Sequence, residues 1–219
     1  LSDDWRQRGI YLTRYSSPAV YWIVFNMEHP LWKASPALRR AMCLAVDVES
    51  YIDVLFNGRG QRAINILPES IPGHNEAGRG PYYRYDLDAA KALLEKAREE
   101  LRATGMLEPD GSIPTLEFDM VIQGASDQRR GEFFQIQFAK IGLDVKILSN
   151  DWPTLQRKVH QKNSMMYTMG WHADYPDAEN FLQLFYSPNI AKGTNNSNYS
   201  DPQFDAWYEQ IRTMPPGPE

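Results

Sequence analysis

The stretch GWHADYPDAENFL, at residues 170–182, contains aromatic, histidine and acidic side chains close together, and these residue types can bind ligands or catalyse reactions. An apolar run that favours a β-strand, MMYTM at residues 165–169, precedes it, and the helix-like run AENFLQLF overlaps its end. Ligands of open α/β sheets gather beyond the carboxyl ends of the strands. Acidic groups at such a place can bind a metal ion, move a substrate proton, hold a positive ligand group, or only cap the next helix.

Folding alone explains part of this stretch. Pro176 suits a turn, and Asp177 suits the N-cap of a helix that starts at Ala178. Phe181 and Leu184 suit a core. An aspartate between aromatic rings can hold an ammonium group, because the carboxylate gives a charge-assisted hydrogen bond and the rings give a cation–π face and exclude water. The residues left for such a role are Trp171, His172, Asp174 and Tyr175.

Metal binding and catalysis are the alternatives. His172 and Asp174 offer nitrogen and oxygen donors, but the HExxH, CxxC and EF-hand patterns are all absent from the sequence. A paired-carboxylate hydrolase could use Asp174 with Asp177 or Glu179. The sequence also lacks a GxSxG motif and a phosphate-cradling glycine loop. We therefore expect no enzyme, no metal and no cofactor, and keep a hydrolase or metal enzyme built on His172 and Asp174 as the alternative of another class.

The composition narrows the class of protein. Of the 219 residues, 42% are hydrophobic and 23% are charged, which is typical of a folded globular chain. The net charge of −5 argues against a nucleic-acid surface. No apolar stretch approaches the roughly 20 residues that span a bilayer. Cys43 is the only cysteine, and its apolar neighbours in AMCLAV predict that it is buried.

Start and stop signals outline the first half of the chain. Ser35, Asp47 and Asp86 are suited to cap helices, because their side-chain oxygens accept from first-turn N–H groups. The aromatic and β-branched run YWIVFNM predicts a strand. We expect a strand at 21–27, a helix from Pro36, a helix at 48–56, a Pro- and Gly-rich loop at 61–85, and a helix at 87–104.

The second half alternates between strands and helices. We expect strands at 115–124, 143–149 and 165–171, with helices at 126–141 and 152–161 between them. Crossovers of this length require parallel pairing. The sequence therefore predicts an α/β fold with a mixed, largely parallel sheet flanked by helices.

Three stretches, in the same order along the chain, resemble a known family. They are FNMEHPLWKASPALRRAMCLAVDVESYIDVLFNGRG at 25–60, YYRYDLDAAKALLEKA at 82–97, and MGWHADYPDAENFLQLFYSPN…GTNNSNYSDPQFDAWYEQIR at 169–212. They are similar to the extracellular solute-binding proteins of bacterial peptide and nickel ABC importers, the oligopeptide- and dipeptide-binding group. Matches that span nearly the whole chain make this resemblance specific.

The resemblance implies two lobes joined by a hinge, with the ligand engulfed between them. Residues 1–219 are then identified as the C-terminal, ligand-binding lobe, and the N-terminal lobe is expected to lie outside this chain. The implied function is capture of oligopeptides or dipeptides for an ABC transporter permease. We expect a monomer that is periplasmic or attached to the cell surface. Members of the family also bind nickel chelates, haem, sugars and opines, which remain alternative ligands.

The resemblance also implies roles for individual residues. The aspartate of the W..DY motif falls on Asp174, which would pair with the α-amino group of a peptide, with Trp171 as its aromatic neighbour. His172 replaces a residue that is usually small or neutral, and so could alter the polarity of the pocket.

Three further residues are candidates for contacts with the ligand. Arg129 and Arg130 follow the strand that ends in VIQG and could take a ligand carboxylate, or they could be solvated charges at a helix start. Asn195, in the polar loop before the last helix, could contact the ligand or the opposite lobe.

Overall fold

The computed structural model describes residues 2–13, 15–191 and 193–214, and its strands form one sheet in the order β1-β4-β2-β3. The strands are β1 (Ala19–Phe25), β2 (Leu116–Val121), β3 (Val145–Asn150) and β4 (Met166–His172). β2 runs parallel to β3 and β4, whereas β1 runs antiparallel to β4. The predicted α/β fold with a mixed, largely parallel sheet is confirmed.

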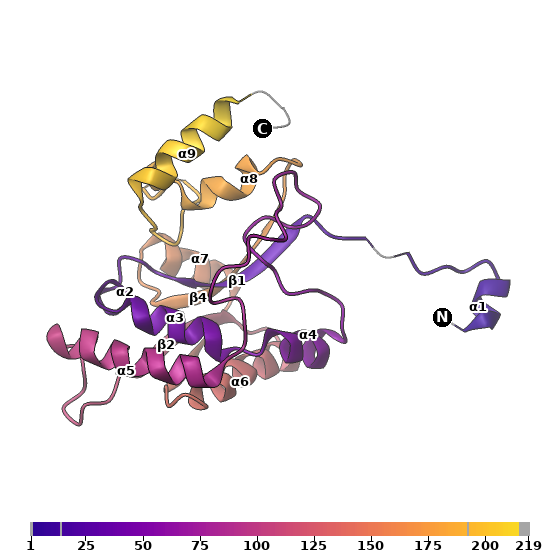
Figure 1. Ribbon diagram of the computed structural model, residues 1–219. Helices are drawn as coiled ribbons and strands as arrows, with labels where there is room; N and C mark the ends of the chain where they lie inside the picture. The colour runs from indigo at the N-terminus through magenta and orange to yellow at the C-terminus, as the bar shows by residue number, and fades with distance from the viewer. Residues whose placement is uncertain (1, 14, 192, 215–219) are drawn as a thin grey trace.

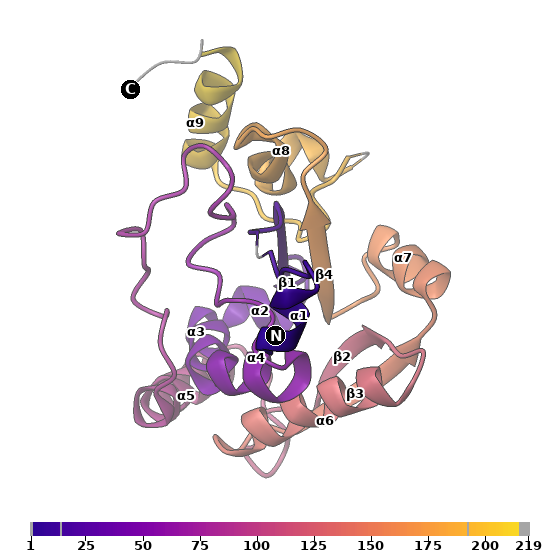
Figure 2. The same ribbon diagram turned by 90° about the vertical axis from the view of Figure 1, so that its right-hand side faces the viewer.

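Helices cover both faces and one end of this sheet. The helices of the described chain are α1 (Asp3–Gln7), α2 (Pro30–Ala34), α3 (Pro36–Ala45), α4 (Val48–Phe56), α5 (Leu87–Ala103), α6 (Ala125–Ala139), α7 (Trp152–His160), α8 (Glu179–Leu182) and α9 (Pro202–Thr213), with the 3₁₀ helices η1 (Gln183–Phe185) and η2 (Ser187–Asn189). Figure 2 shows α7 on one side of β1 and β4, and α3 and α5 on the other. Figure 1 shows α8 and α9 beyond one end of the sheet.

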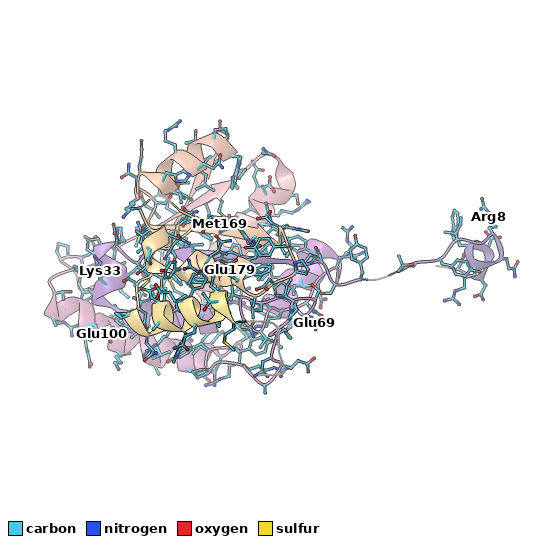
Figure 3. All side chains as sticks on the ribbon, turned by 90° about the horizontal axis from the view of Figure 1, so that it is seen from above. Arg8, Lys33, Glu69, Glu100, Met169 and Glu179 are labelled. Carbon is cyan, nitrogen blue, oxygen red and sulfur yellow. The ribbon has the colours of Figure 1, made fainter. Side chains whose placement is uncertain are left out.

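The N-terminal segment stands apart from this body. Helix α1 buries none of its residues and lies at the end of an extended stretch (Figure 1). Arg8 is accordingly far from the other labelled side chains (Figure 3). Within the described ranges, no helix is long and apolar enough to cross a membrane.

The predicted helix caps are present. Each predicted residue accepts a hydrogen bond from a first-turn N–H group: Ser35 from Leu38, Asp47 from Ser50, and Asp86 from Ala89. Such side chains satisfy donors that a helix leaves without an internal partner. The helices accordingly begin where the sequence predicts.

Two strands end earlier than predicted, β1 at Phe25 and β2 at Val121, and side chains just beyond each end bond to backbone groups. Asn26 follows β1; its N–H still donates to the carbonyl of Met165 at 3.1 Å, and its Nδ2 donates to the carbonyl oxygens of Lys162 and Ser164 at 3.1 and 2.9 Å. After β2, Asp127 Oδ2 accepts from the N–H of Gln123 at 2.8 Å. That bond turns the chain toward α6.

The main core lies between the sheet and helices α2, α3, α5 and α6. Its largest fully buried side chains include Trp32, Phe118 and Phe138. The prediction that Cys43 is buried is wrong: Cys43 is exposed. Arg40 and Cys43 lie three residues apart and share the outward face of α3, since side chains at this spacing point in the same direction.

Asp119 is a buried charged side chain on the face of the sheet opposite the main core, where its carboxylate needs hydrogen-bond partners. It is 1% exposed and projects from β2. Its Oδ1 accepts from Lys158 Nζ at 2.6 Å and from Asn150 Nδ2 at 2.8 Å. Its Oδ2 accepts from Ser164 Oγ at 2.6 Å. The carboxylate therefore ties β2, β3, α7 and the turn before β4 together.

Replacing Asp119 should destabilise the chain. Asp119→Ala leaves Asn150 and Ser164 without their acceptor, and it removes the partner of Lys158. We expect the free energy of unfolding to fall by about 2–4 kcal/mol in urea denaturation. Glu117→Ala is the matched control, because Glu117 is an exposed acidic residue of the same strand. It should change stability by less than about 0.5 kcal/mol, and equal losses in both variants would contradict this role.

Candidate ligand-binding site

The two edges of β4 are paired unequally. β1 pairs with β4 along its whole length, from Met166 to His172. β2 pairs with β4 only at Met166 and Tyr167. From Thr168 onward, the second edge of β4 therefore faces no other strand of the described chain.

The register shows which backbone groups face that free edge. The N–H of Ala173 donates to the carbonyl of Pro18 at 2.8 Å, so this pair is hydrogen-bonded. Bonded and non-bonded pairs alternate along antiparallel strands. Trp171 consequently directs its N–H and C=O toward β1, whereas Gly170 and His172 direct theirs toward the free edge. Nowhere in residues 2–13, 15–191 and 193–214 is there a hydrogen-bond partner for these outward groups.

One buried amide organises the turn after β4. Asn180 is 1% exposed, and its Oδ1 accepts from Trp171 Nε1 at 2.9 Å and from the N–H of Asp174 at 3.1 Å. The Asn180 side chain thus joins the end of β4, the following turn and α8. We did not predict this role. The only signal was an asparagine beside the apolar Phe181 and Leu182, where a buried amide must find partners.

The three acidic groups of the motif have three different environments. The prediction that Asp177 is the N-cap is wrong by one residue: α8 begins at Glu179 and its N-cap is Ala178. Asp177 lies one residue earlier, and its Oδ1 accepts from the N–H of Glu179 at 2.8 Å. The two carboxylate oxygens of Glu179 accept from the hydroxyl groups of Tyr175 and Tyr208. Asp174 is exposed, and its carboxylate has no hydrogen bond or ion pair with any other residue that the structure describes.

The tyrosines beside Glu179 remain hydrogen-bond donors. The hydrogen bond to Glu179 raises the pKa of Tyr175, and burial together with the same carboxylate raises the pKa of Tyr208. Both hydroxyl groups therefore stay protonated at neutral pH and keep both oxygens of Glu179 occupied.

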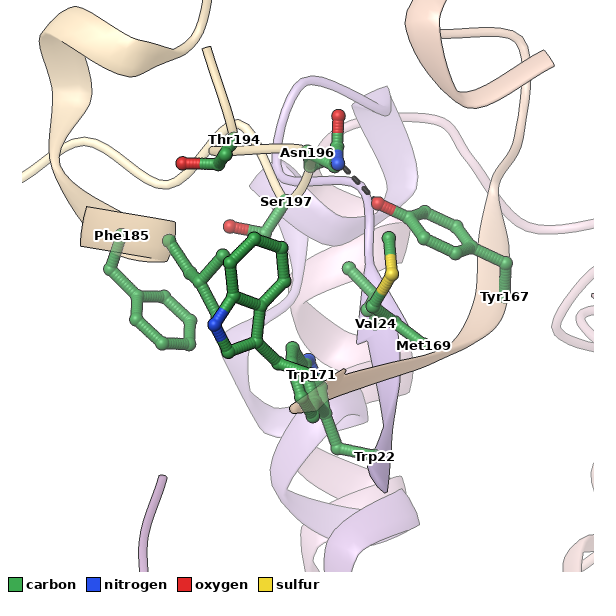
Figure 4. A pocket seen from close by; sticks show the side chains of 10 residues that line it. Trp22, Val24, Tyr167, Met169, Trp171, Phe185, Thr194, Asn196 and Ser197 are labelled. Atoms are coloured by element: carbon green, nitrogen blue, oxygen red, sulfur yellow. Dashed lines mark hydrogen bonds between the residues drawn. The ribbon is translucent and has the colours of Figure 1, made fainter. Parts of the chain in front are cut away.

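A small aromatic pocket adjoins Trp171. It encloses about 30 Å³, between the β1–β4 ribbon and the segment after α8. Figure 4 shows Trp22, Trp171 and Phe185 around it, with the hydroxyl of Tyr167 bonded to Asn196. Its lining residues are Trp22, Val24, Tyr167, Met169, Trp171, Leu184, Phe185, Thr194, Asn196 and Ser197. The space suits a water molecule or a methyl group.

The predicted loop at 61–85 supports this end of the sheet. It contains no helix or strand, as expected, and it rises from α4 toward α8 before descending to α5 (Figure 1). Ile71 is buried in a cluster with Val20 of β1 and Phe181 of α8. The loop thereby holds the ribbon end and the turn of Asp174 together.

The structure separates the other charged candidates from Asp174. Arg129 and Arg130 lie on α6, which Figures 1 and 2 place at the opposite end of the molecule from α8. Arg130 pairs with Asp127, and Arg129 is exposed. His172 is exposed, and its Nε2 lies 3.5 Å from Ser17 Oγ. No cluster of three His, Cys, Asp or Glu side chains that could hold a metal ion occurs in the described part of the chain.

Asn195 is 1% exposed, and its amide group is engaged inside the protein. Its Nδ2 donates to the carbonyl oxygens of Tyr186 and Tyr199 at 3.1 and 2.9 Å. Its Oδ1 accepts from Ser197 Oγ at 2.9 Å. In this arrangement Asn195 orders the loop before α9 and has no free side-chain group for a ligand.

Comparison with known proteins identifies a family. Residues 3–193 match the model of bacterial extracellular solute-binding proteins, family 5 Middle. The oligopeptide-binding protein OppA of Bacillus subtilis is 26% identical over 89% of this chain and 34% of its own length. Heme-binding protein A of Haemophilus influenzae is 28% identical over 85% of this chain and 32% of its own length.

A solved structure shows the same fold. The periplasmic binding protein DppA of Helicobacter pylori, in complex with the peptide STSA, superposes with a TM-score of 0.73 at 27% identity. The match covers 90% of this chain and 36% of DppA. The chain thus spans about a third of the length of the curated relatives it matches.

Removing the amide of Asn180 should loosen the turn. Asn180→Ala leaves the indole N–H of Trp171 and the N–H of Asp174 without their acceptor, so we expect a loss of about 2–3 kcal/mol in urea denaturation. Tryptophan emission should also shift to the red as Trp171 becomes more hydrated. The matched control is Asn163→Ala, which removes an amide from an exposed turn. An Asn180→Ala variant as stable as this control would contradict the role of Asn180.

Proposed function

The chain belongs to the bacterial extracellular solute-binding proteins of family 5, and from this premise we propose that it captures peptides for an ABC importer. We place it as the C-terminal lobe, residues 1–219, of a two-lobed protein that closes around its ligand. The coverage of about a third of each curated relative supports a chain that forms one part of a longer protein. The partner would be an ABC transporter permease, and the chain would act outside the cytoplasm.

The observation that carries the peptide proposal is the free carboxylate of Asp174. Asp177 accepts from the N–H of Glu179, and Glu179 accepts from two tyrosine hydroxyls, so Asp174 is the acidic group of this motif without a partner among the described residues. Trp171 is its aromatic neighbour, held by the same Asn180 oxygen. A peptide α-amino group, positively charged below about pH 8, fits this arrangement.

The free edge of β4 supports an extended ligand. Gly170 and His172 offer two N–H and two C=O groups to a chain lying alongside, and Asp174 follows directly beyond them. An extended peptide could add to this edge as a further strand, with its amino end at Asp174. Main-chain pairing of this kind tolerates different peptide sequences, because it uses no ligand side chain.

A different small solute is the second candidate, supported by the similarity to a heme-binding protein. A nickel chelate, haem, a sugar or an opine bound by the same fold would need neither a free amine nor a peptide main chain. Peptide titrations separate the two cases. Turnover of the added peptides would instead favour a hydrolase that uses His172 and Asp174.

Asp174 should determine amine recognition. In calorimetric titrations of the full-length protein with a pool of tripeptides, we expect Asp174→Asn to raise the half-saturating concentration about 10- to 100-fold, since a charge-assisted hydrogen bond contributes about 1.5–3 kcal/mol. The N-acetylated pool should bind weakly to both forms. Asp177→Asn is the control, because it removes an equal charge three residues away and keeps an oxygen that can accept from the N–H of Glu179. Equal effects of the two substitutions would show that only net charge matters.

Strand pairing predicts an alternating pattern along the ligand. Methylating a ligand main-chain nitrogen that faces β4 removes a donor and adds bulk, so affinity should fall at least about tenfold. Methylating the next nitrogen, which faces away, should change affinity far less. Titration with tripeptides methylated at one position at a time measures this, and equal losses at adjacent positions would contradict pairing with the β4 edge.

A further inference from the structure

Helix α9 is anchored to the segment that follows the motif. Ser187 donates from its backbone N–H to Asp205 Oδ1 at 2.9 Å. The rings of Tyr186 and Tyr208 lie 4.4 Å apart between their centroids. These contacts attach α9 beside α8, as Figure 1 shows. The position of α9 is therefore fixed relative to the turn that carries Asp174.

Glu179 connects that anchor to the exposed side of the site. Its Oε1 accepts from Tyr208, which is 4% exposed, and its Oε2 accepts from Tyr175, which is 46% exposed. A carboxylate that receives two hydroxyl groups is restrained in its rotation, because turning it breaks both bonds. The orientation of Tyr175, the residue directly after Asp174, thus depends on a side chain of α9.

Each oxygen of Glu179 accepts from a tyrosine hydroxyl, so an amine that bound Glu179 would compete with these two bonds. Losing the Tyr208 hydroxyl would remove the donor to Oε1 and release the carboxylate to rotate. Tyr175 would then lose its fixed acceptor.

We propose that Glu179 is a positioning residue that couples α9, through Tyr208, to Tyr175 and the ligand-binding aspartate Asp174. This coupling rests on the proposed capture of an amine-bearing peptide. It makes α9 part of the recognition machinery although none of its residues needs to touch the ligand. Because coupling between two sites is reciprocal, a bound peptide should also stabilise the attachment of α9.

A double-mutant cycle on the full-length protein tests the coupling. The half-saturating concentration of the free-amine tripeptide pool is measured calorimetrically for the wild type, Tyr208→Phe, Tyr175→Phe and the double variant. We expect each single substitution to raise it about 3- to 10-fold. The double variant should be no worse than the more severe single one, since both substitutions remove ends of one link. In hydrogen exchange, the pool should slow exchange in α9 of the wild type but not of Tyr208→Phe.

Tyr186→Phe is the matched control. It removes the hydroxyl that donates to Glu209 Oε1 at 2.6 Å and keeps the ring against Tyr208. Its half-saturating concentration should stay within twofold of the wild type, as should its response in hydrogen exchange. An equal loss in this control would mean that any disturbance of α9 weakens binding.

Two other outcomes separate the coupling from the proposed function. A Tyr208→Phe variant that unfolds more easily but binds the pool like the wild type would overturn the coupling and leave peptide capture intact. Additive losses in the double variant would overturn it as well. If the wild type binds neither the free nor the N-acetylated pool, peptide capture fails, and the coupling to a ligand amine fails with it.

Discussion

The unequal pairing of β4 is the constraint on which the rest of the site depends. β1 follows β4 to His172, whereas β2 leaves it after Tyr167. The last residues of β4 therefore project as part of a two-stranded ribbon, which is marginally stable in water by itself. The cluster of Val20, Ile71 and Phe181 supports this ribbon. β2 continues beside β3 to Val121 but diverges from β4 after Asp119, and this divergence creates the free edge. The long loop at 61–85 supplies the apolar contact that keeps the edge in place.

The three acidic residues of the motif carry the same charge but differ in their hydrogen-bond partners, and these partners determine what each can do. Asp177 is used by a helix N-terminus and Glu179 by two hydroxyl groups, which leaves Asp174 free. Three unpartnered carboxylates so close together would repel one another and recruit cations without selection. Hydrogen bonds orient Asp177 and Glu179, and Asp174 is left as the carboxylate of the motif that has no bonded partner among the described residues.

The sequence predicted the side-chain roles that depend on residues nearby in the chain. Asp86 caps α5 through a backbone group three residues away, so its role can be recognised from the sequence alone. Asn180 serves Trp171 and Asp174, and Glu179 serves Tyr208, 29 residues further along. Those roles depend on how α8 packs against β4 and α9, which no local pattern contains.

Dependence on tertiary packing also explains where the structure differs from the sequence-based predictions. Asn195 was chosen as a polar side chain in a polar loop, but the loop closes around it and uses its amide three times. Cys43 was placed in a core because its sequence neighbours are apolar, yet a helix in an α/β layer buries only part of its circumference. The free edge of β4 begins where β2 diverges from it, after Asp119, although β2 itself continues to Val121 beside β3. That divergence is a property of the sheet that no local pattern contains.

The exposure of Asp174 bears on the proposal that a second lobe closes over the ligand. An ion pair in water contributes about 0–1 kcal/mol, because both charges give up hydration and the solvent screens their attraction. A charge-assisted hydrogen bond shielded from water contributes about 1.5–3 kcal/mol. Asp174 is exposed to water. In the two-lobed arrangement proposed above, a surface that closes over the ligand would supply the missing shield and convert a weak contact into a selective one.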